Sequence, residues 1–214
     1  MTVTGRSGKV RLERRLVTAK HGAALLERKQ HIMADELDRL QLHADGIRQE
    51  WEDRAREAAV WLRRAAGLDG RAQIEAAATA EPAEVEIQWG GAMGVTYPED
   101  AHCRLPGTTL PGGSSALSFA ALAHRSALTA AVQHAAVLRA VLLLSTELTK
   151  TRTRQRAVEN RWIPSLENAL TAIRRTLEDQ ELEESLRVRW AADRTEKPAG
   201  RPTPPRVPQE LESS

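Results

Sequence analysis

The apolar residues of the first 66 positions recur at alternating steps of four and three. Starting from Leu12, fourteen of the sixteen positions reached are apolar, and only Gln30 and Arg54 are polar. A 3.5-residue repeat held over seven heptads is typical of a coiled-coil helix. It predicts a helix over residues 8–66 that ends at Gly67, a residue type favoured just after helices. The seam positions are Leu12, Leu16, Ala19, Ala23, Leu26, Gln30, Met33, Leu37, Leu40, Ala44, Ile47, Trp51, Arg54, Ala58, Trp61 and Ala65.

A second long helix is predicted over residues 115–193, with Ser115 as its N-cap. Its seam keeps the alternation as far as Trp162 and then takes two successive four-residue steps. This stutter adds one residue beside Pro164, where proline removes a helical hydrogen bond and crowds the carbonyl of Asn160. We therefore expect a kink or a local unwinding at Pro164. The seam positions are Val137, Val141, Leu144, Leu148, Thr151, Gln155, Val158, Trp162, Leu166, Leu170, Ile173 and Leu177.

The segment between the helices, residues 67–114, has a different pattern. Two short runs of alternating apolar residues predict a β-hairpin over residues 84–97, with a tight turn at Gly90 and Gly91. The alternating residues are Val85, Ile87 and Trp89, then Met93, Val95 and Tyr97. An isolated hairpin is marginal in water, so this one is expected to pack on a helix or on a partner.

The last residues, 195–214, contain five prolines and little apolar material. Such a segment cannot bury enough surface to fold, and we predict a disordered tail. The remaining 194 residues are predicted to be mainly α, forming a single elongated helical hairpin, a long antiparallel two-helix coiled coil with the β-hairpin at its tip. If Gly67 faces about residue 117, then Arg28 and Lys29 lie near residues 154–156.

Charge and cysteine content indicate the type of surface and the cellular compartment of the protein. The 31 Lys and Arg residues nearly balance the 29 Asp and Glu residues, for a net charge of +2. This balance suits a helix surface covered by ion pairs better than a nucleic-acid-binding surface. A single cysteine, Cys103, indicates a reducing, cytoplasmic compartment. No run approaches 18 uninterrupted apolar residues, so we expect no membrane-spanning helix and no export signal.

Residues 150–164, KTRTRQRAVENRWIP, concentrate five cations before the proline. The rest of the sequence gives little sign of a nucleotide-binding, metal or catalytic site. The stretch GRSGKV at Gly5 to Val10 lacks the spacing and the preceding strand of a phosphate-binding loop. The six histidines have no metal-site spacing, and the carboxylates of residues 177–184 have no predicted pocket. We predict that the protein is not an enzyme and binds no cofactor or metal.

Three separated stretches, AKHGAALLERKQHI, GVTYPED and KTRTRQRAVENRWIP followed by LEDQELEES, together resemble the D subunit of the V/A-type rotary ATPases. The likeness extends over about residues 5–193. The matching positions are Ala19, Lys20, Gly22, Leu25, Leu26 and Lys29, then Thr151, Arg154, Ala157, Glu159, Ile163 and Pro164. The sequence departs from the family pattern at Thr153, Gln155, Arg156 and Val158, and Arg156 stands where the family tends to have asparagine.

The resemblance implies a central-stalk, or rotor-axle, subunit. Such a subunit couples ATP hydrolysis or synthesis in the catalytic head to rotation of a membrane ring and to proton or sodium transport. The implied partners are the catalytic and regulatory head subunits, a small central-stalk subunit and a ring-socket subunit. The chain would be peripheral to the membrane, at its inner face.

A positive belt facing the head is the predicted interface. A kinked shaft at Pro164 would contact the surrounding subunits unequally. Together with Glu159, the belt contains Arg11, Arg14, Arg15, Lys20, Arg28, Lys29, Lys150, Arg152, Arg154, Arg156 and Arg161.

Two other functions compete with this one. A coiled-coil tether or chaperone hairpin would explain the seam, although not the three matched stretches. A nucleic-acid-binding protein could use the same arginines on phosphates, but the near-neutral charge and the lack of interleaved aromatic residues argue against it.

Overall fold

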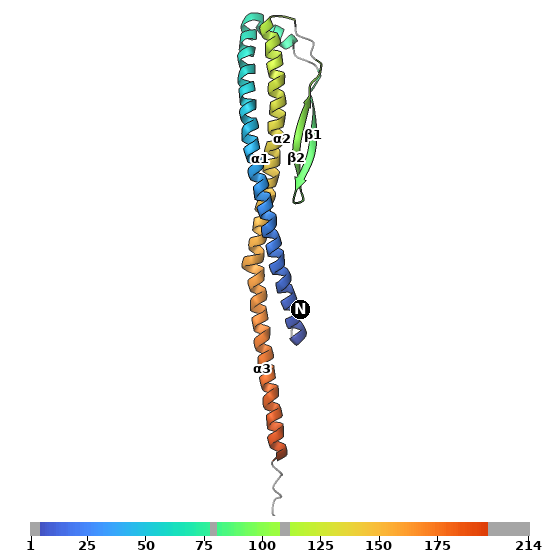
Figure 1. The fold of residues 1–214 in the computed structure, drawn as a ribbon, viewed down its shortest axis with the longest axis vertical. Coiled ribbons are helices and arrows are strands. Elements are labelled where there is room, and N and C mark those ends of the chain that lie inside the picture. Colours follow the sequence, from blue (N-terminus) through green and yellow to red (C-terminus); the bar gives the residue numbers. More distant parts are fainter. Residues whose placement is uncertain (1–4, 78–80, 108–111, 197–214) are drawn as a thin grey trace, which may run out of the picture. The chain divides into compact units, whose positions relative to one another are not determined.

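The computed structural model describes residues 5–77, 81–107 and 112–196. In chain order these form helix α1 (Gly5–Ala76), strands β1 (Glu84–Ala92) and β2 (Val95–Arg104), helix α2 (Ser115–Ala157), the π-helix η1 (Val158–Trp162) and helix α3 (Ile163–Glu196) (Figure 1). The predicted class, two long helices with a short β-hairpin, is confirmed. The predicted tail lies outside the described residues from position 197 onward, and α3 runs to Glu196.

The chain divides into two compact units. We call residues 19–162 the central unit, and residues 1–18 with 163–214 the terminal unit. A single stalk over residues 1–194 stays a prediction. In the terminal unit, the start of α1 packs antiparallel on α3 through buried Leu12, Leu166 and Leu170. Two ion pairs flank this contact, Glu13 with Arg174 at 3.2 Å and Arg6 with Glu181 at 3.1 Å.

The seam predicted for the first helix is confirmed by burial. Every buried apolar residue of α1 occupies a predicted seam position, because only one face of a helix can meet its partner. Five of the eight are alanines; the set is Leu12, Ala19, Ala23, Met33, Leu40, Ala44, Ala58 and Ala65. In the central unit the antiparallel register also agrees with the prediction, since Gln30 donates a hydrogen bond to Gln155 and Trp51 stacks on His134.

The predicted end of α1 at Gly67 is wrong. The first helix runs on to Asp69, and the backbone leaves helical geometry at Gly70, where φ is 77° and ψ is 170°; a second short helical stretch, included in α1, then reaches Ala76. The Asp69 carboxylate there accepts hydrogen bonds from the backbone N–H (2.8 Å) and the hydroxyl of Ser114. Ser114, rather than Ser115, is the N-cap of α2, since its hydroxyl accepts a hydrogen bond from the Leu117 N–H.

The hairpin is present, but it is longer than residues 84–97 and turns elsewhere. Its two-residue turn is Met93 and Gly94, with φ of 51° and 82°, while Gly90 and Gly91 lie within β1. Positive φ at both turn residues matches the right-handed twist of the strands. A Cβ atom on Gly91 would lie 2.8 Å from the carbonyl oxygen of Val95, so close backbone approach explains glycine there.

The extra residue of the stutter is accommodated by η1. A π-helical turn contains one more residue than an α-turn, so the buried face passes from Val158 to Ile163 and on to Leu166. The seam position predicted at Trp162 is therefore wrong, and its side chain is 44% exposed. The expected local unwinding is found directly before Pro164, while the kink itself stays a prediction.

The hairpin is anchored on the helices of the central unit through β2. Tyr97 lies in a buried cluster with residues of α1 and α2, namely Met33, Leu40, Ala140, Leu144 and Leu148. Ala101, further along β2, is also buried. The packing expected for a hairpin of this size is thus provided within the chain.

Averaged hydropathy gives a different result from the search for uninterrupted apolar runs. Among the described residues, one helical stretch, Ser115–Arg194, contains an 18-residue window with mean hydropathy 1.7. By length and composition alone this window could cross a membrane. The core helix of a soluble protein passes the same test, so the finding is weak evidence.

Candidate interaction surface

The cations of residues 150–161, which we call the row for their order in the sequence, are exposed side chains of α2 and η1, and their two-residue spacing distributes them over more than one face of the helix. The side chains of four arginines make no ion pair or hydrogen bond with any part of the chain that the structure describes: Arg152, Arg154, Arg156 and Arg161. Lys150 pairs with Glu147 at 3.4 Å. The row therefore carries positive charge that the described residues do not neutralise.

Some arginines of α1 are ion-paired within their own helix. Five of them pair with an acidic side chain three or four positions away, the spacing that places two residues on one helix face. These five are Arg39, Arg48, Arg54, Arg56 and Arg71. Arg28 and Arg63 of α1, however, also make no side-chain ion pair or hydrogen bond within the described residues, so unpaired arginines are not confined to the row.

The antiparallel register brings part of α1 beside this row. The side-chain amide of Gln30 donates to Gln155, which places the neighbouring Arg28 and Lys29 close to Arg154 and Arg156. The predicted proximity of these two basic stretches is confirmed. Lys20 lies in the same unit, more than two helical turns from Arg28. Arg11, Arg14 and Arg15 are exposed on α1 in the terminal unit. A continuous belt stays a prediction.

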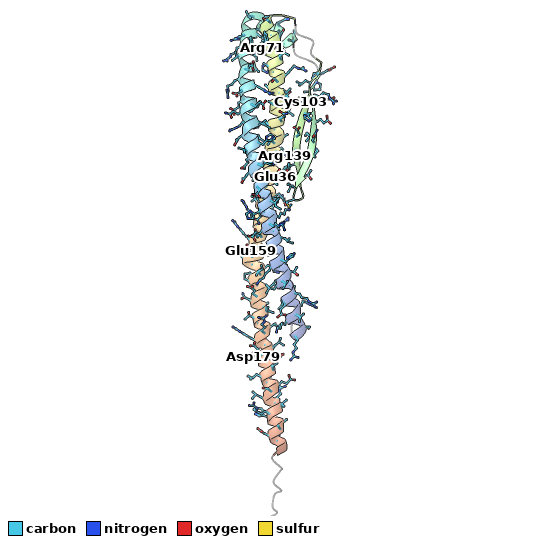
Figure 2. The ribbon with its side chains drawn as sticks, viewed as in Figure 1. Glu36, Arg71, Cys103, Arg139, Glu159 and Asp179 are labelled. Atoms are coloured by element: carbon cyan, nitrogen blue, oxygen red, sulfur yellow. The ribbon has the colours of Figure 1, made fainter. Side chains whose placement is uncertain are left out.

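Glu159 is the one acidic residue among the predicted interface side chains, and Figure 2 labels it in the π-helical stretch. Its carboxylate accepts a hydrogen bond from Gln155 Nε2 at 2.8 Å. Gln30, Gln155 and Glu159 therefore form one chain of hydrogen bonds across the helix pair. A contact of Glu159 with a partner stays a prediction.

Both glutamines occupy seam positions, where apolar side chains are the norm. Each is partly buried; the Gln30 amide N–H donates to the Gln155 oxygen, and the Gln155 amide N–H donates to Glu159. A polar pair in a coiled-coil seam is stable only when the two helices are in register, because any shift leaves amides buried without partners. The pair thus fixes the helix alignment directly under the cations. The sequence offered the signal, since Gln30 interrupts the seam, but the pairing with Gln155 was not predicted.

A second polar cluster, also missed from sequence, joins the hairpin to α1. The Tyr97 hydroxyl donates to Glu36 Oε1 at 2.8 Å, and Arg39 donates to both carboxylate oxygens of Glu36 at 2.7 and 2.9 Å. Burial, together with the hydrogen bond to Glu36, raises the pKa of Tyr97 to about 12. The hydrogen bonds from Arg39 hold the pKa of Glu36 below its ordinary value, against the opposing effect of burial. Figure 2 labels Glu36 on α1.

Metal chemistry finds no support among residues 5–77, 81–107 and 112–196. No group of three or more His, Cys, Asp or Glu side chains there is arranged to hold a metal ion. Cys103 lies half-buried on β2, without a disulfide partner.

Comparison with known proteins supports the resemblance noted from the sequence. The sequence model of the ATP synthase D-subunit family matches residues 9–193. The chain is 28% identical over 196 residues to the A-type ATP synthase D subunit of Methanopyrus kandleri, an alignment that spans 88% of this chain and 84% of that protein. It is 32% identical over 191 residues to the V-type ATP synthase D subunit of Thermotoga neapolitana, across 86% and 93% of the two chains.

Proposed function

The chain belongs to the ATP synthase D-subunit family and is a subunit of a V/A-type ATPase; from this premise we propose that it is the central-stalk, or rotor-axle, subunit. In this role it couples ATP hydrolysis or synthesis in the head to rotation of a membrane ring and to ion transport. The observation that carries the proposal is the row of unneutralised arginines on a helix pair whose register is fixed beneath it.

A rotating shaft needs differential contact with the subunits around it. Each orientation of the shaft must favour one nucleotide state of the head over the others, and only a difference in interaction free energy can do this. Long-ranged attraction between charges tolerates rotation, whereas deep apolar interlocking would hold one angle too tightly. Exposed guanidinium groups without intramolecular partners supply such contacts.

The partners follow from the same role. The catalytic and regulatory head subunits surround the belt, while a small central-stalk subunit and a ring-socket subunit bind elsewhere on the chain. The protein itself is non-catalytic, and it is peripheral to the membrane on the cytoplasmic side, held there through the complex.

Association is the first test of this proposal. The tagged chain is purified from detergent-solubilised native membranes and the eluate is analysed by mass spectrometry and ATPase assay. We expect about three copies each of the catalytic and regulatory subunits per copy of this chain, together with ATPase activity. Recovery of the chain without head subunits would contradict the proposal.

Coupling is tested by charge removal. The variant Arg152→Gln, Arg154→Gln, Arg156→Gln should lower ATP-driven ion pumping per ATP hydrolysed in the reconstituted complex, because it removes three unpaired charges. The control Arg48→Gln, Arg56→Gln, Arg71→Gln removes the same charge from arginines that are already ion-paired, and should leave coupling unchanged. Equal pumping by both variants and the wild type would mean that the arginine row takes no part in coupling.

A further inference from the structure

The outer edge of β1 is an unpaired strand edge. The sheet has two strands, and within the described residues the backbone of β1 is hydrogen-bonded to β2 alone. The helix α2 packs extensively against β2 rather than β1. One row of N–H and C=O groups along a nine-residue strand is therefore free to pair with another strand.

The side chains of β1 carry only part of the protection that natural edge strands have against such pairing. Natural edge strands carry lysine or proline, or are very short. β1 contains neither residue type, and its apolar Val85, Ile87 and Trp89 are 50%, 42% and 61% exposed. A bulge at Gln88 and Trp89 is its one irregularity. The segment Glu84 to Gln88 alternates acidic or polar residues with apolar ones, so each kind occupies its own face.

The charged residues of the hairpin sequence are mostly acidic. From Ala72 to Cys103 the sequence contains no lysine or arginine, although the chain has 31 of them. The same stretch contains six acidic residues, Glu75, Glu81, Glu84, Glu86, Glu99 and Asp100. Arg104 lies 4.0 Å from Glu86 and offsets one of them weakly. The hairpin is thus an acidic segment of a chain whose net charge is positive.

The strand is also held in place before any partner arrives. Tyr97 and Ala101 are buried and fix β2 on the helices, and β1 is paired to β2 over its whole length. An incoming strand would therefore meet a preformed template and would not have to order the hairpin, which lowers the entropic cost of binding.

We propose that the outer edge of β1 accepts an extended strand from another subunit of the complex, in which apolar side chains alternate with lysine or arginine. The apolar residues lie beside Val85 and Ile87, and the basic ones beside Glu84 and Glu86. A second copy of this chain fits poorly, because it would bring another acidic edge against the first.

This inference rests on the proposed function, and amide hydrogen exchange separates the two. Exchange of a peptide covering residues 84–92 is measured in the free chain and in the purified ATPase complex. We expect exchange roughly tenfold slower or more in the complex, because half of the strand's amides gain partners. Head subunits that co-purify while β1 exchanges at its free rate would overturn this inference and leave the proposed function standing. Failure to recover head subunits would overturn both.

A variant and its control make the test specific. Ile87→Lys places a charge on the strand edge and should abolish the protection, while Thr96→Lys, on exposed β2 surface opposite Gly91, should retain it. A photo-crosslinker at Gln88 identifies the partner segment. Crosslinks to an extended stretch with alternating basic and apolar residues support the proposal, whereas crosslinks to a helix or to a second copy of this chain contradict it.

Discussion

Tyr97 is the chain's only tyrosine, so its ionisation can be followed without interference from another phenol. The side chain is 4% exposed, and its hydroxyl donates to Glu36 Oε1 at 2.8 Å. Removing the phenolic proton would break this hydrogen bond and place two negative charges side by side. We therefore predict that alkaline pH releases the hairpin from α1 through this one group.

The size of the effect follows from the pKa. Burial, followed by the hydrogen bond to Glu36 and its charge, raises the pKa of Tyr97 from 10.0 to about 12. A rise of this size corresponds to about 3 kcal/mol in favour of the protonated form in the folded chain. Because the folded pKa lies above the unfolded one, this contribution is complete below about pH 10 and is lost as the pH rises towards about 12.

The assay is a spectroscopic titration of tyrosinate absorbance, with circular dichroism recorded at each pH. The midpoint should lie near pH 12 in the native chain and near 10 in urea. In the variant Glu36→Gln the midpoint should fall, yet stay above 10, because burial persists without the carboxylate charge. The control Glu50→Gln, which removes a carboxylate distant from Tyr97, should leave it unchanged. A native midpoint near 10 in a chain that remains helical would refute the reasoning.

The remaining predictions concern stability and are measured by urea unfolding. Met33→Ala should cost about 2–5 kcal/mol, since Met33 is fully buried, while its half-exposed neighbour Ile32→Ala should cost under about 1 kcal/mol. Gly94→Ala should destabilise by about 1 kcal/mol because φ is 82° at the turn, whereas Gly46→Ala, in an open helical position, should stabilise by a similar amount; equal effects would contradict the assigned conformations. The pKa of Glu36 is lower in the folded chain than in the unfolded chain, so its ionised carboxylate stabilises the fold above about pH 4.5. This stabilisation is lost as the pH falls further. The urea midpoint should therefore drop less at low pH in Glu36→Gln than in the wild type.

Much of the fold could be predicted because the spacing of apolar residues in the sequence identifies a coiled-coil seam. Every buried apolar residue of α1 occupies a predicted seam position, and the antiparallel register followed from where the chain turns back. Such local periodicity depends on one helix face meeting one partner, and little else competes with it.

The turn of the hairpin could not be predicted in the same way. The sequence offers Gly90 with Gly91 and also Met93 with Gly94, and both pairs are compatible with a two-residue turn. Local sequence does not decide between them; in the observed register Tyr97 packs in the cluster with Met33 and Leu144. The strand glycines are instead needed where neighbouring groups approach closely.

The sequence predicted which residues form the candidate surface, but not which of their charges are paired within the chain. The sequence locates the cations of residues 150–161, yet only the structure reveals that four of those arginines lack a partner within the described part of the chain. Likewise, the polar link from Gln30 through Gln155 to Glu159 spans residues far apart in the chain. Side-chain pairing between helices depends on rotamers and register together, which periodicity alone does not determine.

The buried alanines of the central unit set the distance between its helices. Ala58, Ala65, Ala120 and Ala130 are each at most 2% exposed, and such small side chains let two helix backbones approach to about 8 Å. Enlarging one of them, as in Ala65→Leu, adds volume where none is free and must push the helices apart. A leucine-rich coil loses stability mainly when its side chains are shortened, whereas these positions should reject growth most strongly. Alanine is therefore needed here because its small side chain keeps the helices close. In related chains, the size of a side chain should restrict substitution at these positions more than its polarity does.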